Sequence, residues 1–431
     1  MPRGKKQFKA LPGMADILPK DQVIWQKVER AVTSIANFYE FEKVSTPILE
    51  SEELFIRGTG KDSQVEKEMY RFRTKNGERV ALRPDFTPSL IRVYLEKGME
   101  TMPKPVKLWS SGPLFRYKKL QSNSYRQFHH FDFEIIGNQS PGLDALLIQL
   151  FSNILGQLSL LDYQLQINYL GCEECHSNYS RRLKRFYKKR IKELCPDCRK
   201  NLEKNPLRLL KCEKEKCKRL RKNIPSITEF LCENCKRHFD QVLEFLDAIN
   251  ISYTINPYLI PEYEYYSRTV FEFISKPKTK ERRVLIEGGR YDSLIKNLGG
   301  KSTPAIGGAG TVEFIVEEIR KKKINIKIKS ENFEEKAKIF LIQLGALAKK
   351  KLLSLVEEFK KAGIKASFSI EKDKLKTQLR LAKKKNVKYS LILGQKEAID
   401  NTIIVRDMDT GIQEIVPLKE IVKKMKKLLK V

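Results

Sequence analysis

Long apolar runs are missing from this sequence. No stretch approaches the roughly 18 consecutive apolar residues that a membrane-spanning helix needs. The basic start, MPRGKKQFKALPGMADILP, also lacks the apolar segment of a signal peptide. These two absences exclude a helical membrane protein and predict a soluble, cytoplasmic one. The chain has no internal repeat either.

Cysteine is absent outside residues 172–235, and all eight cysteines lie within that stretch. A chain without an export signal is expected to keep its thiols reduced, so disulfides are not expected. The spacing, typical of two four-cysteine zinc sites, gives four pairs: Cys172 and Cys175, Cys195 and Cys198, Cys212 and Cys217, and Cys232 and Cys235. We predict that the second pair joins the third and the first joins the fourth. Reduced thiols packed in helical hairpins are the alternative.

Acidic residues are in deficit. The chain has 53 aspartates and glutamates against 84 lysines and arginines, which gives a formal net charge of +31. A polyanion would bind such a surface with release of counterions. Because the basic residues also form runs, as in Arg181–Lys189 and Lys321–Lys329, we predict a nucleic-acid partner. The alternative is a lysine-rich surface without a site.

At 431 residues the chain is long enough for two or three domains. Residues 20–40 have the periodicity of an amphipathic helix, and a second helix is expected over Thr87–Lys97. Met69–Arg73 and Arg79–Leu82 alternate on either side of an Asn-Gly turn, which indicates a β-hairpin. KLWSSGPLFRY and YRQFHHFDFEIIG are two further strands. Consecutive hairpins with interspersed helices predict an α+β fold with an antiparallel sheet.

The second half changes composition three times. Residues 171–240 are rich in lysine, arginine and cysteine, as expected of an insertion. Sheet-like sequence resumes over 241–325, from SYTINPYLIPEYEYYSRTVFEF through RRVLIEGGRYDSLI. A charged linker at 321–336 follows. Strands and helices then alternate over 326–431, which predicts a smaller α/β domain.

The stretch GPLFRYKKLQSNSYRQFHHFDFE, residues 112–134, carries the clearest chemistry. Arg116 ends one predicted strand and Glu134 lies on the next. A guanidinium holds phosphate or carboxylate in a fork, whereas a carboxylate suits an ammonium. The pair therefore fits an amino acid bound beside a nucleotide.

Several motifs occur in a fixed order: GMADILP, TPILESEELFIRGTG, VEKEMYRF, LRPDFTP, GPLFRY with RQFHHFDFEIIG, EYYSRTVFEF, GGRYDSLI and TPAIGGAG. Together they resemble histidyl-tRNA synthetase, a class II aminoacyl-tRNA synthetase. ILGQKE with IIVRDMDTG is similar to its anticodon-binding domain. The resemblance implies a catalytic core over residues 1–170 and 241–325, a helical insertion over 171–240 and an anticodon-binding domain over 326–431.

What the resemblance implies about function is specific. ATP with Mg²⁺ would activate histidine as histidyl-adenylate, tRNA(His) would accept it, and the chain would form a homodimer through the segment around Pro47. Arg116 would be catalytic. Histidine would be held by Asp85, Thr87, His130, Glu134, Tyr265 and Tyr266. ATP would be held by Arg116, Lys118 and Tyr125.

The chain departs from the family pattern where the triphosphate should bind. Phe314 stands where the third motif ends in an arginine, and Pro261 replaces a second arginine. Loss of one preorganised charge-stabilising donor typically costs about a hundred- to a thousandfold in rate. Arg268, Arg290 and Lys118 are candidates to replace the lost charge. The alternative function is a catalytically impaired paralogue that binds tRNA or histidine in a regulatory role.

Three of these features also have a purely structural interpretation. Phe314 is either a block to ATP or simple core filling. His129 and His130 alternate across a strand, so one of them faces the core, and we expect this to be His129. The basic stretch RRLKRFYKKRIK either contacts the tRNA acceptor arm or forms a solvated face.

Overall fold

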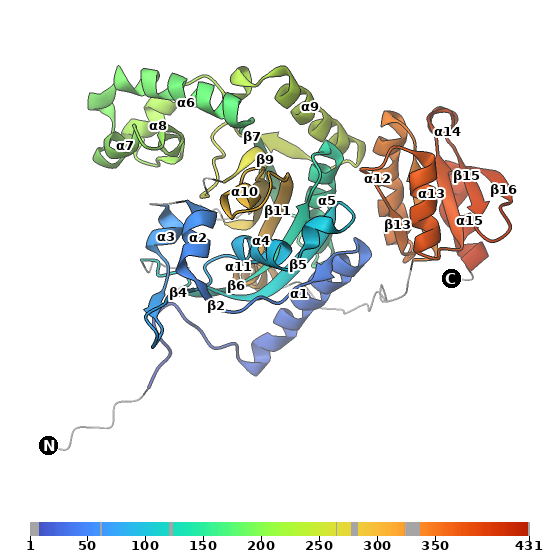
Figure 1. Cartoon of the computed structure of the whole chain (residues 1–431), viewed down its shortest axis with the longest axis horizontal. Coiled ribbons are helices and arrows are strands. Elements are labelled where there is room, and N and C mark those ends of the chain that lie inside the picture. The colour runs from blue at the N-terminus through green and yellow to red at the C-terminus, as the bar shows by residue number, and fades with distance from the viewer. Residues whose placement is uncertain are drawn as a thin grey trace.

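The computed structural model describes residues 8–60, 63–119, 124–263, 265–276, 283–322, 324 and 337–429. Its centre is an eight-stranded sheet in the order β1-β5-β6-β11-β10-β9-β7-β8 (Figure 1). The strands are β1 Glu42–Lys43, β5 Val106–Phe115, β6 Gln127–Ile136, β7 Tyr163–Tyr169, β8 Tyr253–Ile255, β9 Ser267–Ser275, β10 Val284–Arg290 and β11 Ala305–Thr311. The pairings from β5 to β7 are antiparallel, as predicted, whereas the edge strands β1 and β8 pair in parallel.

Helices α1 Pro19–Phe38, α5 Pro141–Gln157 and α11 Val312–Lys321 cover one face of this sheet. Strand β6 alternates across the sheet, so Phe131 and Phe133 contact Phe151 of α5 in the core. The alternate residues His130, Asp132 and Glu134 point to the opposite face. This alternation leaves a polar floor on a sheet whose other side is fully buried.

A three-stranded sheet in the order β2-β4-β3 lies beside the polar face. Its elements and neighbours are β2 Leu49–Ser51, β3 Arg71–Arg73, β4 Arg79–Leu82, α2 Glu52–Thr59, α3 Gln64–Lys67, α4 Thr87–Glu96 and the short η1 Met99–Thr101. The predicted hairpin is β3 and β4, and Gly77 in its turn has a φ of 86°, which glycine adopts without strain. Helices α1 and α4 confirm the two helices predicted in this half.

The insertion is helical and has its own core. Its elements are α6 Glu173–Lys188, η2 Ile191–Glu193, α7 Pro196–Asn201, η3 Pro206–Lys211, α8 Glu215–Arg221, η4 Ile227–Phe230 and α9 Glu233–Ala248. Tyr179, Leu183 and Tyr187 of α6 pack against Leu207 and Leu210 of η3. Sheet sequence was expected throughout 252–273, but the described residues 256–263 and 265–266 form no strand. They turn back from the insertion toward the polar face, and α10 Leu294–Asn297 lies beyond them.

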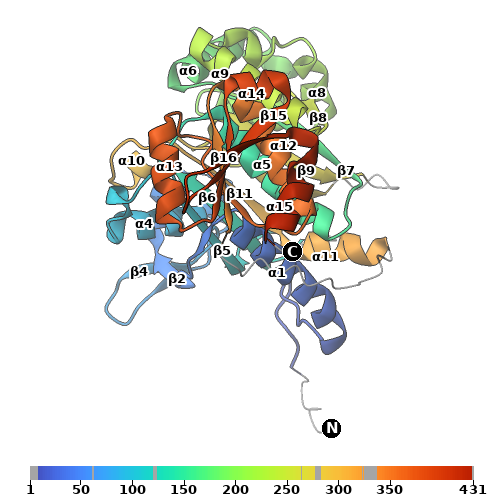
Figure 2. The same cartoon turned by 90° about the vertical axis from the view of Figure 1, so that its right-hand side faces the viewer.

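The C-terminal part is an α/β unit with the sheet order β13-β12-β14-β15-β16 (Figure 2). Its elements are β12 Ile339–Gln343, α12 Ala346–Lys361, β13 Ala366–Phe368, α13 Leu375–Lys384, β14 Tyr389–Leu393, α14 Gln395–Asp400, β15 Thr402–Asp407, β16 Gln413–Pro417, η5 Leu418–Glu420 and α15 Ile421–Leu429. Helix α12 packs against α9, where Ser354 donates to the Ala248 carbonyl at 2.9 Å. Most of the predicted linker at 321–336 lies outside the described residues.

No helix in the described part of the chain is long and apolar enough to cross a membrane.

Candidate active site

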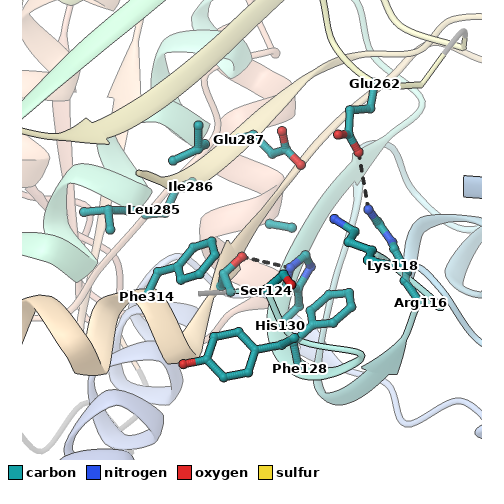
Figure 3. Close-up of a pocket in the computed structure, with 14 residues that line it drawn as sticks. Arg116, Lys118, Ser124, Phe128, His130, Glu262, Leu285, Ile286, Glu287 and Phe314 are labelled. Atoms are coloured by element: carbon teal, nitrogen blue, oxygen red, sulfur yellow. Dashed lines mark hydrogen bonds and ion pairs between the residues drawn. The ribbon is translucent and has the colours of Figure 1, made fainter. Parts of the chain in front are cut away.

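A cavity of about 250 Å³ opens on the polar face where β6, β10 and β11 meet the segment after β5 (Figure 3). We call it the Arg116 cavity. It is lined by Arg116, Lys118, Ser124, Tyr125, Phe128, His130, Glu262, Val284, Leu285, Ile286, Glu287, Ala309, Thr311 and Phe314. All three residues predicted to bind ATP therefore face one space, together with His130.

Arg116 is the buried cation of this cavity, with 4% of its side chain exposed. Its Nε donates to the Pro84 carbonyl at 3.0 Å, which fixes the guanidinium plane. One terminal nitrogen pairs with Glu262 at 3.4 Å and the other donates to the Tyr263 hydroxyl. The dashed line in Figure 3 marks the pair with Glu262. The guanidinium that should meet phosphate is thus held by the protein's own carboxylate.

Asp85 and Glu134 form the acidic part of the floor. The Asp85 carboxylate accepts from the Thr87 amide at the start of α4, at 3.2 Å, and Glu134 accepts from the Tyr291 hydroxyl. Burial raises the pKa of Glu134 to about 8, and the neighbouring Asp85 carboxylate acts in the same direction. Both carboxylates lie where an ammonium would neutralise them.

Gly307 of β11 lies directly opposite Glu134 in the strand register. A Cβ at this position would overlap the Glu134 carboxylate. The glycine of the TPAIGGAG motif therefore makes room for the acid, a packing role that a glycine-rich pattern alone does not reveal.

Tyr263, Tyr265 and Tyr266 form an aromatic wall on the segment that precedes β9. Tyr263 stacks on Tyr265 with ring centroids 5.0 Å apart, and Tyr265 meets Tyr266 at 4.7 Å. The Tyr265 hydroxyl reaches Asp85 at 3.5 Å. The two tyrosines predicted for the histidine site thus lie beside the acidic floor.

His129 and His130 have the predicted division of roles. His129 points to the helical face, where its Nδ1 lies 2.9 Å from Glu313 and its ring packs edge-on against Trp25. His130 lines the Arg116 cavity, and its Nε2 is 3.0 Å from the Thr311 hydroxyl. His129 is therefore structural.

Phe314 lines the cavity at the position expected to hold an arginine. Its ring lies 6.2 Å from that of Tyr125, and the Arg283 guanidinium sits 5.8 Å from its centroid. Arg283 is itself ion-paired with Glu317 of α11. The aromatic side chain is partly buried as well, so it fills the core and lines the cavity at once.

Two of the three cations proposed to replace the missing arginines form ion pairs outside the Arg116 cavity. Arg290 is fully buried and bonds Asp144 from its Nε at 3.0 Å. Arg268 pairs with Asp292 at 2.7 Å. Lys118 does line the cavity, beside Arg116.

Sequence reasoning missed three acids of this site. Glu262 and Glu287 line the Arg116 cavity, and Asp132 lies on the floor between His130 and Glu134. Burial raises the pKa of Glu287 to about 7, and Glu262 adds to the effect. The alternation of β6 places Asp132 on the polar face, so its position could have been predicted from the sequence. The position of Glu262 could not, because its contact with Arg116 joins segments far apart in the sequence.

The eight cysteines gather into two clusters, Cys172 with Cys175, Cys232 and Cys235, and Cys195 with Cys198, Cys212 and Cys217. This grouping is the predicted one. In each cluster all four sulfur atoms lie within 4.8 Å of one another. The sulfur pairs 172–175, 198–217 and 195–212 are 3.6, 3.8 and 3.9 Å apart. A tetrahedral ion with bonds of about 2.3 Å to sulfur holds its ligands about 3.8 Å apart.

A second, larger hollow of about 800 Å³ runs between the insertion and the catalytic sheet. We call it the insertion groove. Lys184, Lys204, Arg208 and Lys211 make its wall basic, and Cys198 and Cys212 of the second cluster also line it, together with Pro261, Tyr263 and Tyr266. Glu262 lines both hollows, so the groove lies next to the Arg116 cavity.

Comparison with known proteins accords with this geometry. Residues 13–315 match the family described as histidyl-tRNA synthetase, and residues 336–428 match an anticodon binding domain. The histidine–tRNA ligase of Natranaerobius thermophilus is 35% identical over 97% of this chain and 99% of its own length. That of Halothermothrix orenii is 36% identical over 98% and 99%. The crystal structure of apo S. aureus histidyl-tRNA synthetase gives a TM-score of 0.62 at 31% identity, covering 97% of this chain and all of that one. The chain belongs to the histidyl-tRNA synthetase family, with its class II fold.

Proposed function

We propose that the chain is a histidine–tRNA ligase. The observation that carries the proposal is the buried Arg116 at the end of β5, facing the floor that holds Asp85 and Glu134. One zwitterionic amino acid spans these groups, with its carboxylate toward Arg116 and its ammonium toward the acids. ATP, supplied as its Mg²⁺ complex, is the second substrate that the family uses.

The first step is nucleotidyl transfer. A histidine carboxylate oxygen attacks the α-phosphorus of ATP, the bond from that phosphorus to the bridging oxygen breaks, and pyrophosphate leaves. Negative charge grows on the phosphoryl oxygens, and Arg116 is placed to stabilise it with help from Lys118. In the second step a terminal ribose hydroxyl of tRNA(His) attacks the carbonyl carbon and AMP leaves.

Each predicted residue has a role in this proposal. Asp85 and Glu134 take the positive groups of histidine, and Thr87 fixes Asp85 through its amide. Tyr265 and Tyr266 cover the imidazole, while His130 borders both substrates. Tyr125 contributes to the ATP side, opposite Phe314. Because Phe314 and Pro261 supply no charge, we expect adenylation to be slower than in relatives that retain both arginines.

Zinc is the proposed ligand of the two cysteine clusters. The sulfur separations match a tetrahedral thiolate site, and backbone amides point at the sulfurs, as from Cys232 to Cys175 at 3.1 Å. The insertion has a small core, so metal would supply stability that its packing lacks. We expect two equivalents per chain.

tRNA(His) is proposed to bind along the basic insertion groove and the C-terminal domain. The groove has a basic wall and lies next to the Arg116 cavity, which supports a path for the terminal nucleotides along it.

Dimerisation is proposed at the small sheet around Pro47, where Ile48, Leu49 and Phe72 are 45%, 46% and 47% exposed. We propose that the homodimer works in the cytoplasm, where charged tRNA is consumed.

The test is pyrophosphate exchange with each of the twenty amino acids, followed by charging of a tRNA(His) transcript. Exchange with histidine alone supports the proposal. Exchange with another amino acid, or charging of a different tRNA, would overturn it. R116K serves as the control, because it keeps one charge but loses the fork and the bond to Pro84.

A further inference from the structure

The floor of the site carries more polar groups than a single carboxylate pair. Ser110 of β5 lies directly opposite Asp132 of β6 in the antiparallel register. His130 and Glu134 flank Asp132 two residues away on the same face. Four polar side chains therefore point to one side of two adjacent strands.

Each of these four side chains has a buried atom without a hydrogen-bond partner among the described residues. The atoms are Ser110 Oγ, His130 Nδ1, Asp132 Oδ2 and Glu134 Oε1. Asp132 is only 1% exposed and Glu134 is fully buried. A polar group that is buried without a partner destabilises the fold. Four such atoms together on one face indicate a place that a polar ligand completes.

The charges around Asp132 are unbalanced. The carboxylates of Asp85 and Glu134 lie near it, and the cations that face it are Arg83 and Arg116. Arg83 donates to the carbonyls of Thr46 and Pro113, at 2.6 and 3.0 Å.

Arg116 is likewise held by Glu262, Tyr263 and the Pro84 carbonyl. His130 Nδ1 lies 3.9 Å from the Asp132 carboxylate, and β5 and β11 place only Ser110 and Ala309 opposite it. All three nitrogens of Arg116, and Nε and Nη1 of Arg83, are therefore bonded to groups other than Asp132.

We propose that Asp132 is a third carboxylate of the amino-acid site and makes the site select an amino acid whose side chain is itself a cation. This inference rests on the proposed function and deepens it. The α-ammonium satisfies one carboxylate, and a ring protonated at both nitrogens satisfies the others. The bound form of histidine is then the imidazolium, because neighbouring carboxylates favour the charged ring.

The electrostatics of the floor agree with this assignment. Burial raises the pKa of Asp132 well above its ordinary value, and Asp85 and Glu134 raise it further. A ligand with two positive centres compensates two of the three carboxylates. A ligand with only the α-ammonium compensates one and leaves two.

The test compares histidine with β-(1,2,4-triazol-3-yl)alanine, which has a ring of the same shape but much lower basicity. D132N keeps the shape of the side chain and removes its charge. We expect D132N to raise the KM for histidine about tenfold, the effect of one pKa unit of differential interaction, while kcat changes less than threefold. The preference for histidine over the triazole should narrow by the same factor.

D292N is the matched control, because Asp292 pairs with Arg268 and lies outside the floor that β5 and β6 form. It should leave the histidine to triazole ratio unchanged. An unchanged ratio in D132N, or tighter histidine binding by D132A, would overturn the inference while the proposed function stands. Absence of histidine binding by the wild type would reject both.

Discussion

In the proposed function Arg116 binds the α-phosphate of ATP, and in this structure its guanidinium is paired with Glu262, so removal of the Glu262 charge should improve ATP binding. The two groups lie 3.4 Å apart, with Arg116 4% exposed and Glu262 41% exposed. An exposed ion pair is worth about 0.2–1 kcal/mol, and because solvent screens Glu262 we take the upper end of this range and no more. In the proposed function the α-phosphate of ATP must displace Glu262 before it can bind Arg116. Removal of the Glu262 charge should therefore make the binding free energy of ATP more favourable by about 1 kcal/mol, which corresponds to a nearly fivefold fall in the KM for ATP.

The variant is E262Q, and the assay is pyrophosphate exchange at saturating histidine with ATP varied. E244Q is the control, since Glu244 forms a similarly exposed pair, with Lys350, far from the cavity. The gain should shrink at about 0.5 M salt, where screening weakens the wild-type contact. An unchanged or higher KM for ATP in E262Q would refute the idea that Glu262 competes with the nucleotide.

Four further outcomes are expected. F314R should raise histidine-dependent exchange at least tenfold, since it returns a cation to the cavity wall, and an unaltered rate would mean that the ring is only core filling. C198S should lose about one zinc per chain, as counted by metal analysis. Because the second cluster lines the insertion groove, the variant should also charge tRNA at least tenfold more slowly, while its rate of pyrophosphate exchange stays within threefold of the wild type. Burial raises the Glu134 pKa from 4.5 to about 8, so the stability of the wild type should fall as pH rises through that range. The Tm of E134Q relative to the wild type should therefore increase by a few degrees between pH 5 and 8.5. A Tm difference that does not change with pH would contradict this. L49D should convert the dimer to monomer in sedimentation equilibrium, because it places a charge on an exposed apolar edge strand.

Local patterns predicted the strands that carry the site. Period-2 alternation placed β5 and β6, and the Asn-Gly turn placed the hairpin of β3 and β4. Arg116 and Glu134 follow from these strands, since each sits at a fixed position of its own run. The grouping of the cysteines could also be predicted, because two cysteines at short spacing supply two ligands to the same metal ion.

Features that depend on tertiary packing could not be predicted from the sequence. Helix α5 is apolar on nearly all sides, so it lacks the amphipathic period that marks a helix. The Arg116–Glu262 contact joins residues 146 positions apart. The expectation of sheet through residues 256–263 and 265–266 was wrong, because the aromatic residues there form a wall of stacked tyrosines and not a strand.

The most direct test of the central claim is charging of a tRNA(His) transcript with labelled histidine by the full-length protein, purified in the presence of zinc. We expect slow but complete formation of histidyl-tRNA that depends on ATP and is abolished in R116A. Failure to form any histidyl-tRNA, at enzyme concentrations comparable with those of the tRNA, would contradict the assignment.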